Sequence, residues 1–180
     1  VPGLPQVGNG QPNGSSTTSK IIGVESGGKA TAKNPNSSAY GPGQFIKSTW
    51  MQFLKEAHPE LATGGKLGEK ELLELRSDPN LSSEATSWYA GKAIDELDSL
   101  DLPATDANIY LHHFLGPGGM KSILTADPDT PVKDLLTPEQ INANKTILGG
   151  ARTAGDVIDW ATAKMGVLEG TPILGRIGRK

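Results

Sequence analysis

The sequence predicts a mainly α-helical fold with at most a small β element. Apolar residues recur at helical spacing over residues 45–57, 81–100 and 154–168. Glycine clusters and proline-led caps separate these segments, as is typical of helix ends. No run alternates polar and apolar residues over the length of a long strand. We therefore expect a helical bundle with a small β-hairpin or irregular loop.

The first 19 residues differ from the rest of the chain. They are rich in Pro, Gly, Asn and Ser and contain no charged side chain. Such a segment buries too little apolar surface to offset the entropy lost on ordering. We expect residues 1–19 to be a flexible arm or linker, which would tether a single domain over residues 20–180.

The first half of that domain is expected to begin with a short, buried helix that ends at Gly27-Gly28 and holds Glu25 in its last turn. Residues 29–44 are polar and turn-rich, which indicates the hairpin or irregular loop. An amphipathic helix over 45–57 follows. A second one over about 69–76 is expected to stop at Asp78-Pro79.

The second half is expected to contain four helical segments. Ser82 or Ser83 would cap the helix over 81–100. A helix over 105–115 would end at residues 116–119, which read Gly-Pro-Gly-Gly. Residues 137–140 (Thr-Pro-Glu-Gln) form a capping box before a further helix. The last helix, over 154–168, would pack on the domain rather than act on a membrane, because Asp156 and Asp159 interrupt its apolar stripe.

Composition excludes several classes of function. The net charge is −3, so no basic field indicates nucleic acid, and no apolar run reaches the roughly 20 residues needed to span a bilayer. There is no cysteine. His112 and His113 are adjacent, so a helix points them about 100° apart and they cannot chelate one metal together. With no phosphate-binding loop or dinucleotide fingerprint either, we expect no metal and no cofactor.

Glu25 is the candidate for acid–base chemistry. It follows Ile21, Ile22 and Val24, so its carboxylate is expected at the edge of an apolar surface. The negative end of the helix dipole lies at the same place. Both effects favour a raised pKa, which a general acid requires to keep its proton near neutral pH. The alternative for a lone glutamate at a helix end is a solvated surface residue.

The residues around Glu25 resemble two motifs of the lytic transglycosylases (SLT domain) and the goose-type lysozymes. The match consists of separated identities in order over residues 25–50, namely Glu25-Ser26, Ser37/Ser38-Ala39, Gly41, Gln44 and Thr49-Trp50. Pro42-Gly43 stands where the family has Leu-Met. The resemblance extends over about residues 20–120 and implies an α+β lysozyme-like fold. The helices over 137–168 match no part of the family.

A third family motif is echoed by residues 107–119, ANIYLHHFLGPGG. Aligning the glycines places His113 at the family's tyrosine position, whereas aligning the aromatic hydroxyl places Tyr110 there. The resemblance thus implies Glu25 as the catalytic residue and Ser38, Gln44, Tyr110 and His113 as substrate-binding residues. A core position for Tyr110 and a surface position for His112 remain the alternatives.

The resemblance implies cleavage of the β-1,4 bond between N-acetylmuramic acid and N-acetylglucosamine in bacterial peptidoglycan. No Asp or Glu lies between Ser26 and Lys55, which favours a single-glutamate route to a 1,6-anhydro product over a hydrolytic muramidase. Glu56, Glu84 or Asp106 are the alternative second carboxylates.

A non-catalytic peptidoglycan-binding module or phage tail component is the competing class.

The His-Phe-Leu-Gly sequence is similar to phage-encoded members of the family. We therefore expect a monomeric endolysin of phage or prophage type that acts on the cell wall.

Overall fold

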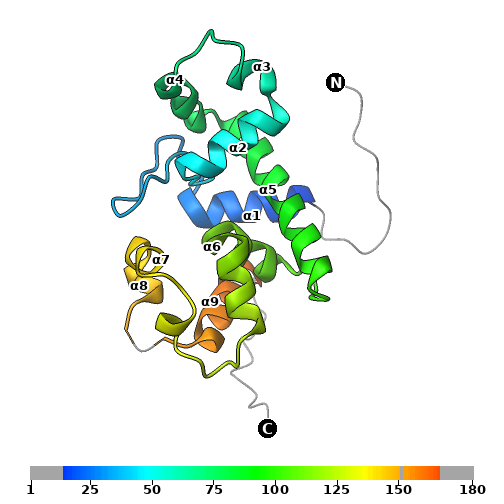
Figure 1. Cartoon of the computed structure of the whole chain (residues 1–180), viewed down its shortest axis with the longest axis vertical. Coiled ribbons are helices and arrows are strands. Elements are labelled where there is room, and N and C mark those ends of the chain that lie inside the picture. The colour runs from blue at the N-terminus through cyan, green and yellow to red at the C-terminus, as the bar shows by residue number, and fades with distance from the viewer. Residues whose placement is uncertain (1–13, 151, 167–180) are drawn as a thin grey trace. The chain divides into compact units, whose positions relative to one another are not determined.

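The computed structural model describes residues 14–150 and 152–166, and over these ranges the protein is mainly helical (Figure 1). The prediction of a mainly α fold is confirmed. The chain divides into two compact units, Val1–Thr105 and Asp106–Lys180, which we call the N-terminal unit and the C-terminal unit. One catalytic domain over 20–180 stays a prediction.

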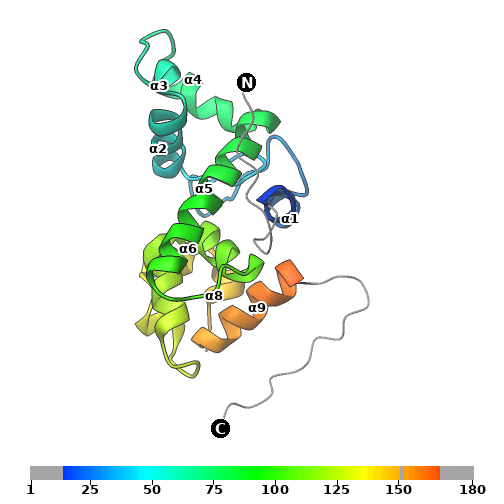
Figure 2. The ribbon, with the colours of Figure 1, turned by 90° about the vertical axis from the view of Figure 1, so that its right-hand side faces the viewer.

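Helix α1 (Gly14–Ser26) opens the N-terminal unit and packs against helix α5 (Pro79–Ser99) (Figure 2). Residues 14–19 belong to this helix, so the predicted arm over 1–19 is too long at its C-terminal end. Thr17 and Thr18 are buried, and the Thr18 hydroxyl lies 2.9 Å from that of Ser87 in α5. Composition missed this because these polar residues are ordered by a hydrogen bond to a distant helix. Residues 1–13 lie outside the described part.

Residues 27–46 connect α1 to helix α2 (Lys47–Ala57) through an irregular hairpin. Tyr40 forms isolated antiparallel bridges with Lys33 and with Phe45. The amide of Gly41 donates to the carbonyl of Ala32 at 2.9 Å, which closes the hairpin. The predicted small hairpin or irregular loop is confirmed, and we call residues 27–46 the hairpin loop.

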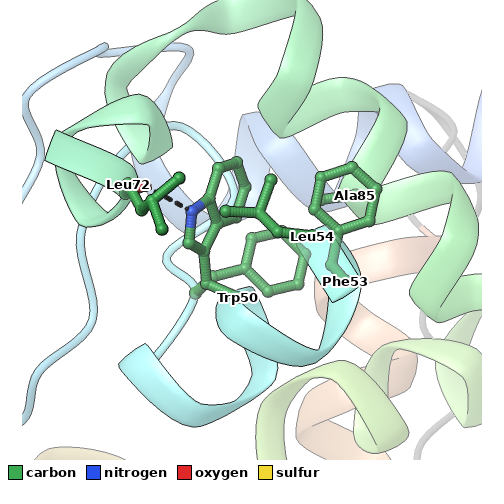
Figure 3. Close-up of a cluster of buried hydrophobic side chains, with 6 residues drawn as sticks. Trp50, Phe53, Leu54, Leu72 and Ala85 are labelled. Carbon is green, nitrogen blue, oxygen red and sulfur yellow. Dashed lines mark hydrogen bonds between the residues drawn. The ribbon is translucent and has the colours of Figure 1, made fainter. Parts of the chain in front are cut away.

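The core of the N-terminal unit forms where α2 meets the helices that follow it. These are α3 (Pro59–Ala62), α4 (Glu69–Glu74), the 3₁₀ helix η1 (Leu75–Ser77) and α5, which contributes Ala85. Trp50 is fully buried, and its indole N–H donates to the carbonyl of Leu72 at 2.8 Å (Figure 3). Its ring lies 5.2 Å from that of Phe53. Each such side chain contributes about 1.5–3 kcal/mol by leaving water.

Helix α5 begins earlier than its sequence indicates. The Asp78 carboxylate accepts from the amide of Leu81 at 2.9 Å, and Pro79 occupies the first turn. Asp78 is therefore the N-cap, and the prediction of Ser82 or Ser83 is wrong. Ser82 is buried, and its hydroxyl accepts from the amide of Gly43 in the hairpin loop. Asp78-Pro79 does end the preceding helical segment, as expected, but it also starts the next one.

The C-terminal unit begins with helix α6 (Asp106–Thr125), which is broken at Gly116. Gly116 has φ 75° and ψ 174°, and Pro117 starts the second half. This confirms the predicted end of the first helix, since a positive φ favours glycine. The 3₁₀ helix η2 (Val132–Asp134) and helices α7 (Pro138–Ala143), α8 (Lys145–Leu148) and α9 (Ala154–Gly166) follow. The predicted capping box of α7 is present, with Thr137 and Gln140 bonded reciprocally.

Helix α9 packs on α6, as expected for the last helix. Ala154, Val157, Ala161 and Met165 are buried on its inner side. The predicted extension to residue 168 lies outside the described residues. None of the helices described is long and apolar enough to cross a membrane.

Candidate functional site

Glu25 lies in the last turn of α1, as predicted. The residue as a whole is half-buried, and its Oε1 atom is shielded from solvent. Gly27 and Gly28 follow with φ 61° and 79°, and the amide of Gly27 donates to the carbonyl of Gly23 at 3.0 Å. Two glycines in the left-handed region end the helix directly after the Glu25-Ser26 pair. The carboxylate is therefore held at the helix end with one oxygen out of water.

Ser26 joins this helix end to the hairpin loop. Its hydroxyl donates to the carbonyl of Pro42 at 2.7 Å and lies 3.2 Å from the carbonyl of Ile22 in α1. It also accepts from the amide of Gly28 at 3.0 Å. The Glu-Ser pair of the first motif thus has a physical basis, because the serine fixes the position of the loop relative to the residue that precedes it.

The segment Gly41–Gln44 is fixed from two further sides. Gly41 has φ 86°, and a Cβ there would lie 1.9 Å from the carbonyl oxygen of Arg76. The amide of Gly43 donates to the Ser82 hydroxyl at 3.0 Å, and a Cβ on Gly43 would meet Thr86 Oγ1 at 2.9 Å. Only glycine permits these close approaches to η1 and α5.

Gln44 supports the hairpin loop from within. Its φ is 52°, and its amide nitrogen donates to the carbonyls of Ala32 at 2.9 Å and Gly41 at 2.8 Å. Both partners are acceptors, so both amide hydrogens are used inside the loop. Substrate binding by Gln44 stays a prediction. Such binding would use Oε1, which is a hydrogen-bond acceptor.

Ser38 is exposed and stands at the start of α2. Its hydroxyl accepts from the amide of Lys47 at 3.2 Å, and its carbonyl accepts from Arg76 at 2.6 Å. Ser38 therefore caps a helix that its own N-cap residue, Ile46, cannot cap with a side chain. Its contact with substrate stays a prediction.

The last motif residues are the half-buried Thr49 and the fully buried Trp50. Trp50 is in the core cluster, and Thr49 hydrogen-bonds the side chain of Tyr89. Burial raises the pKa of Tyr89, and the bond from Thr49 opposes that shift. This part of the motif therefore holds α2 against α5 and the core of the N-terminal unit.

The remaining predicted residues lie in the C-terminal unit. Tyr110 is 2% exposed, and its ring lies 5.9 Å from that of Phe114 and 5.6 Å from that of Trp160. This is the core position that the sequence left open for it. His113 is half-buried, whereas His112 is buried, so a surface position for His112 is wrong. Substrate contact by Tyr110 or His113 stays a prediction.

Two of the alternative second carboxylates have partners elsewhere in the N-terminal unit. Glu56 Oε2 accepts from Lys92 at 2.8 Å and from the Trp88 indole at 3.1 Å. The hydrogen bond from Lys92 is the main cause that lowers the pKa of Glu56. Glu84 lies 2.9 Å from the imidazole of His58. Both carboxylates are thus committed to the exposed side of α2 and α5.

A pocket of about 700 Å³ opens between the hairpin loop and α4 with η1. Ser38 lines it, whereas Glu25 and Gln44 are not in its lining. The buried Arg76 also lines it, and sequence reasoning missed this residue. The available signal was its place four residues after Leu72, on the face that α4 buries.

Among the residues that the structure describes, no group of three or more His, Cys, Asp or Glu side chains could hold a metal ion. No protein-family model matches the chain, and a search of curated proteins finds no match.

Proposed function

We propose that the protein cleaves the β-1,4 bond between N-acetylmuramic acid and N-acetylglucosamine in peptidoglycan, with Glu25 as general acid. The observation that carries the proposal is the buried Oε1 of Glu25 at the C-terminal end of α1. Burial and the negative end of the helix both favour the protonated carboxyl. The motif residue Ser26 and the segment Gly41–Gln44 hold the adjoining backbone in place.

In the proposed reaction the Glu25 carboxyl gives its proton to the glycosidic oxygen as the bond breaks and oxocarbenium character develops. The resulting carboxylate then takes the proton of the muramoyl C6 hydroxyl. The C6 oxygen closes on C1 and gives a 1,6-anhydro ring. One residue thus acts first as acid and then as base, and no water is consumed.

The charge pattern around the hairpin loop supports this route over hydrolysis. A hydrolase needs a second carboxylate as nucleophile or to activate water. Residues 27–55 contain no Asp or Glu, and both Glu56 and Glu84 are engaged by cations or imidazole elsewhere. The lysines of the same segment suit a polymer with acidic peptides.

The direct test is Glu25→Gln, which keeps the shape of the side chain and removes the transferable proton. We expect loss of about two or more orders of magnitude in the rate of turbidity decrease of purified sacculi, because general acid catalysis contributes that much. The matched control is Glu139→Gln, the same change at an exposed position in the other unit. Equal clearing by both variants would reject Glu25 as the general acid, whereas absence of clearing by the unsubstituted chain would favour a non-catalytic binding module.

Product masses decide between the two bond-breaking routes. Digested sacculi are expected to release muropeptides that end in anhydromuramic acid. Products heavier by one water, with a reducing end, would instead assign the protein as a muramidase.

A further inference from the structure

The pocket between the hairpin loop and α4 with η1 lies entirely within the N-terminal unit. Its volume of about 700 Å³ falls within the range of roughly 300–1,000 Å³ that is usual for small-ligand sites. The catalytic role proposed for Glu25 does not use it. We call it the Arg76 pocket.

Among the described residues of that lining, Arg76 alone is both charged and buried; it is 7% exposed. Its Nε donates to the carbonyl of Leu73 at 2.9 Å, and its Nη1 donates to the carbonyls of Ser38 at 2.6 Å and Phe45 at 3.0 Å. The guanidinium lies 5.3 Å from the centre of the Tyr40 ring. These bonds use Nε and Nη1, and Nη2 is the remaining donor nitrogen of a guanidinium that lines the pocket.

The partners of Arg76 are unusual for a buried cation. Buried charges are normally paired with an opposite charge, but Arg76 is held by carbonyl dipoles and an aromatic face. Desolvation accordingly lowers its pKa from the ordinary value. A carboxylate brought to Nη2 would supply the missing negative charge through a charge-assisted hydrogen bond.

The exposed residues at the rim carry both signs of charge. Three lysines are joined by two glutamates, and the set is Lys33, Lys47, Lys70, Glu69 and Glu74. Lys33 stands 5.7 Å from the centre of the Tyr40 ring, on which Arg76 also lies. Counting Arg76, cations outnumber anions by four to two. A neutral sugar has no charge to match this set, and the glutamates oppose a doubly charged phosphate.

We propose that the Arg76 pocket binds a short peptide that carries two carboxylates and an amino group. One carboxylate contacts Arg76 Nη2 and the lysines at the rim, and the amino group contacts Glu69 or Glu74. The identification of this peptide as the stem peptide of peptidoglycan rests on the proposed function. The binding chemistry itself does not, because it depends only on the charges of the pocket.

The test is a titration of the isotopically labelled full chain, followed by NMR, with two tripeptides of alanine, γ-linked glutamate and lysine. One has free carboxylates, and in the other both are amidated. Loss of a charge-assisted hydrogen bond is expected to weaken binding by at least about tenfold. Equal binding of the two peptides, or tighter binding of inorganic phosphate than of the free peptide, would overturn the proposal.

Substitutions at the rim locate the site without disturbing Arg76, whose bonds hold the hairpin loop. The double variant Lys33→Gln/Lys47→Gln is expected to bind the peptide with free carboxylates several-fold more weakly. The control is Lys29→Gln/Lys55→Gln, which removes two exposed lysines outside the pocket and should leave binding unchanged. Equal effects of the two pairs would show a general charge effect and would reject the site.

The same titration separates this inference from the proposed function. Glu25→Gln should bind the free peptide as the unsubstituted chain does, because Glu25 is not in the lining. Peptide binding together with sacculus clearing by Glu25→Gln would refute the catalytic role and retain the pocket. Loss of clearing by Glu25→Gln, without a preference for free carboxylates, would do the reverse.

Discussion

The N-terminal unit fixes its central loop with hydrogen bonds between distant segments, whereas the C-terminal unit is held by an aromatic core and a local cap. In the first, Ser26, Ser82 and Arg76 each bond the backbone of the hairpin loop. In the second, the rings of Tyr110, Phe114 and Trp160 gather between α6 and α9. Polar bonds of this kind specify one loop conformation, while ring packing tolerates small shifts.

The largest expected effect comes from Gly41→Ala. The positive φ and the contact with the Arg76 carbonyl should together cost at least about 2 kcal/mol of unfolding free energy. We expect the amides of the hairpin loop to lose protection from hydrogen exchange, while those of the C-terminal unit keep theirs.

Gly27→Ala is the matched control for Gly41→Ala. Gly27 has φ 61°, but a Cβ added there would meet no atom of the described residues within 4 Å. The backbone strain alone should cost about 1 kcal/mol. If Gly41→Ala were no worse than Gly27→Ala, the close approach to Arg76 would not constrain the loop.

Thr137→Ala should have an intermediate effect, and in the other unit. Loss of an N-cap hydroxyl costs about 1 kcal/mol, here at the start of α7. Thr162→Ala is the control, because that threonine bonds its own helix in an exposed position. Urea unfolding should separate the two variants. Loss of protection in the hairpin loop of Thr137→Ala would contradict an effect confined to the start of α7.

The smallest effect concerns the exposed pair Lys92 and Glu56. Lys92→Met should raise the pKa of Glu56 toward its ordinary value, because the ammonium is the main cause of the lowering. A carboxyl whose pKa is lower in the folded state than in the unfolded state stabilises the fold at a pH above its unfolded-state pKa. This stabilisation disappears as the pH falls through the folded-state pKa. The variant should therefore lose less stability on acidification.

A carboxyl NMR titration reads the Glu56 pKa directly. Lys70→Met serves as the comparison, since its partner Glu74 is 4.0 Å away and both are exposed. An unchanged Glu56 pKa in Lys92→Met would mean that the bonds from Gln52 and Trp88 hold the carboxylate alone.

Local signals in the sequence predicted the helices well and the bonds between them poorly. The ends at Gly27-Gly28 and Gly116 and the Thr137 capping box depend on neighbouring residues, so the chain alone reveals them. Ser82 looked like a cap because serine caps and serine bonds to a distant loop have the same local pattern. Its actual partner, Gly43, is 39 residues away.

The candidate site shows the same division. The position of Glu25 in the last turn of α1 followed from the glycines after it. The sequence did not predict that Gln44 donates its amide hydrogens to the carbonyls of Ala32 and Gly41. A motif gives the type of residue at a position and not the hydrogen bonds that its atoms make. Arg76 was missed because its burial depends on carbonyls supplied by Ser38 and Phe45.

The hydroxyl of Ser26 has a dynamic consequence for the residue beside it. Because one side-chain oxygen joins Pro42 to the end of α1, a displacement of the hairpin loop pulls on the backbone of Glu25. We therefore expect the backbone at Glu25 and the hairpin loop to move together rather than separately. Transverse relaxation of the two segments should show a common exchange rate, and Ser26→Ala should uncouple their motions.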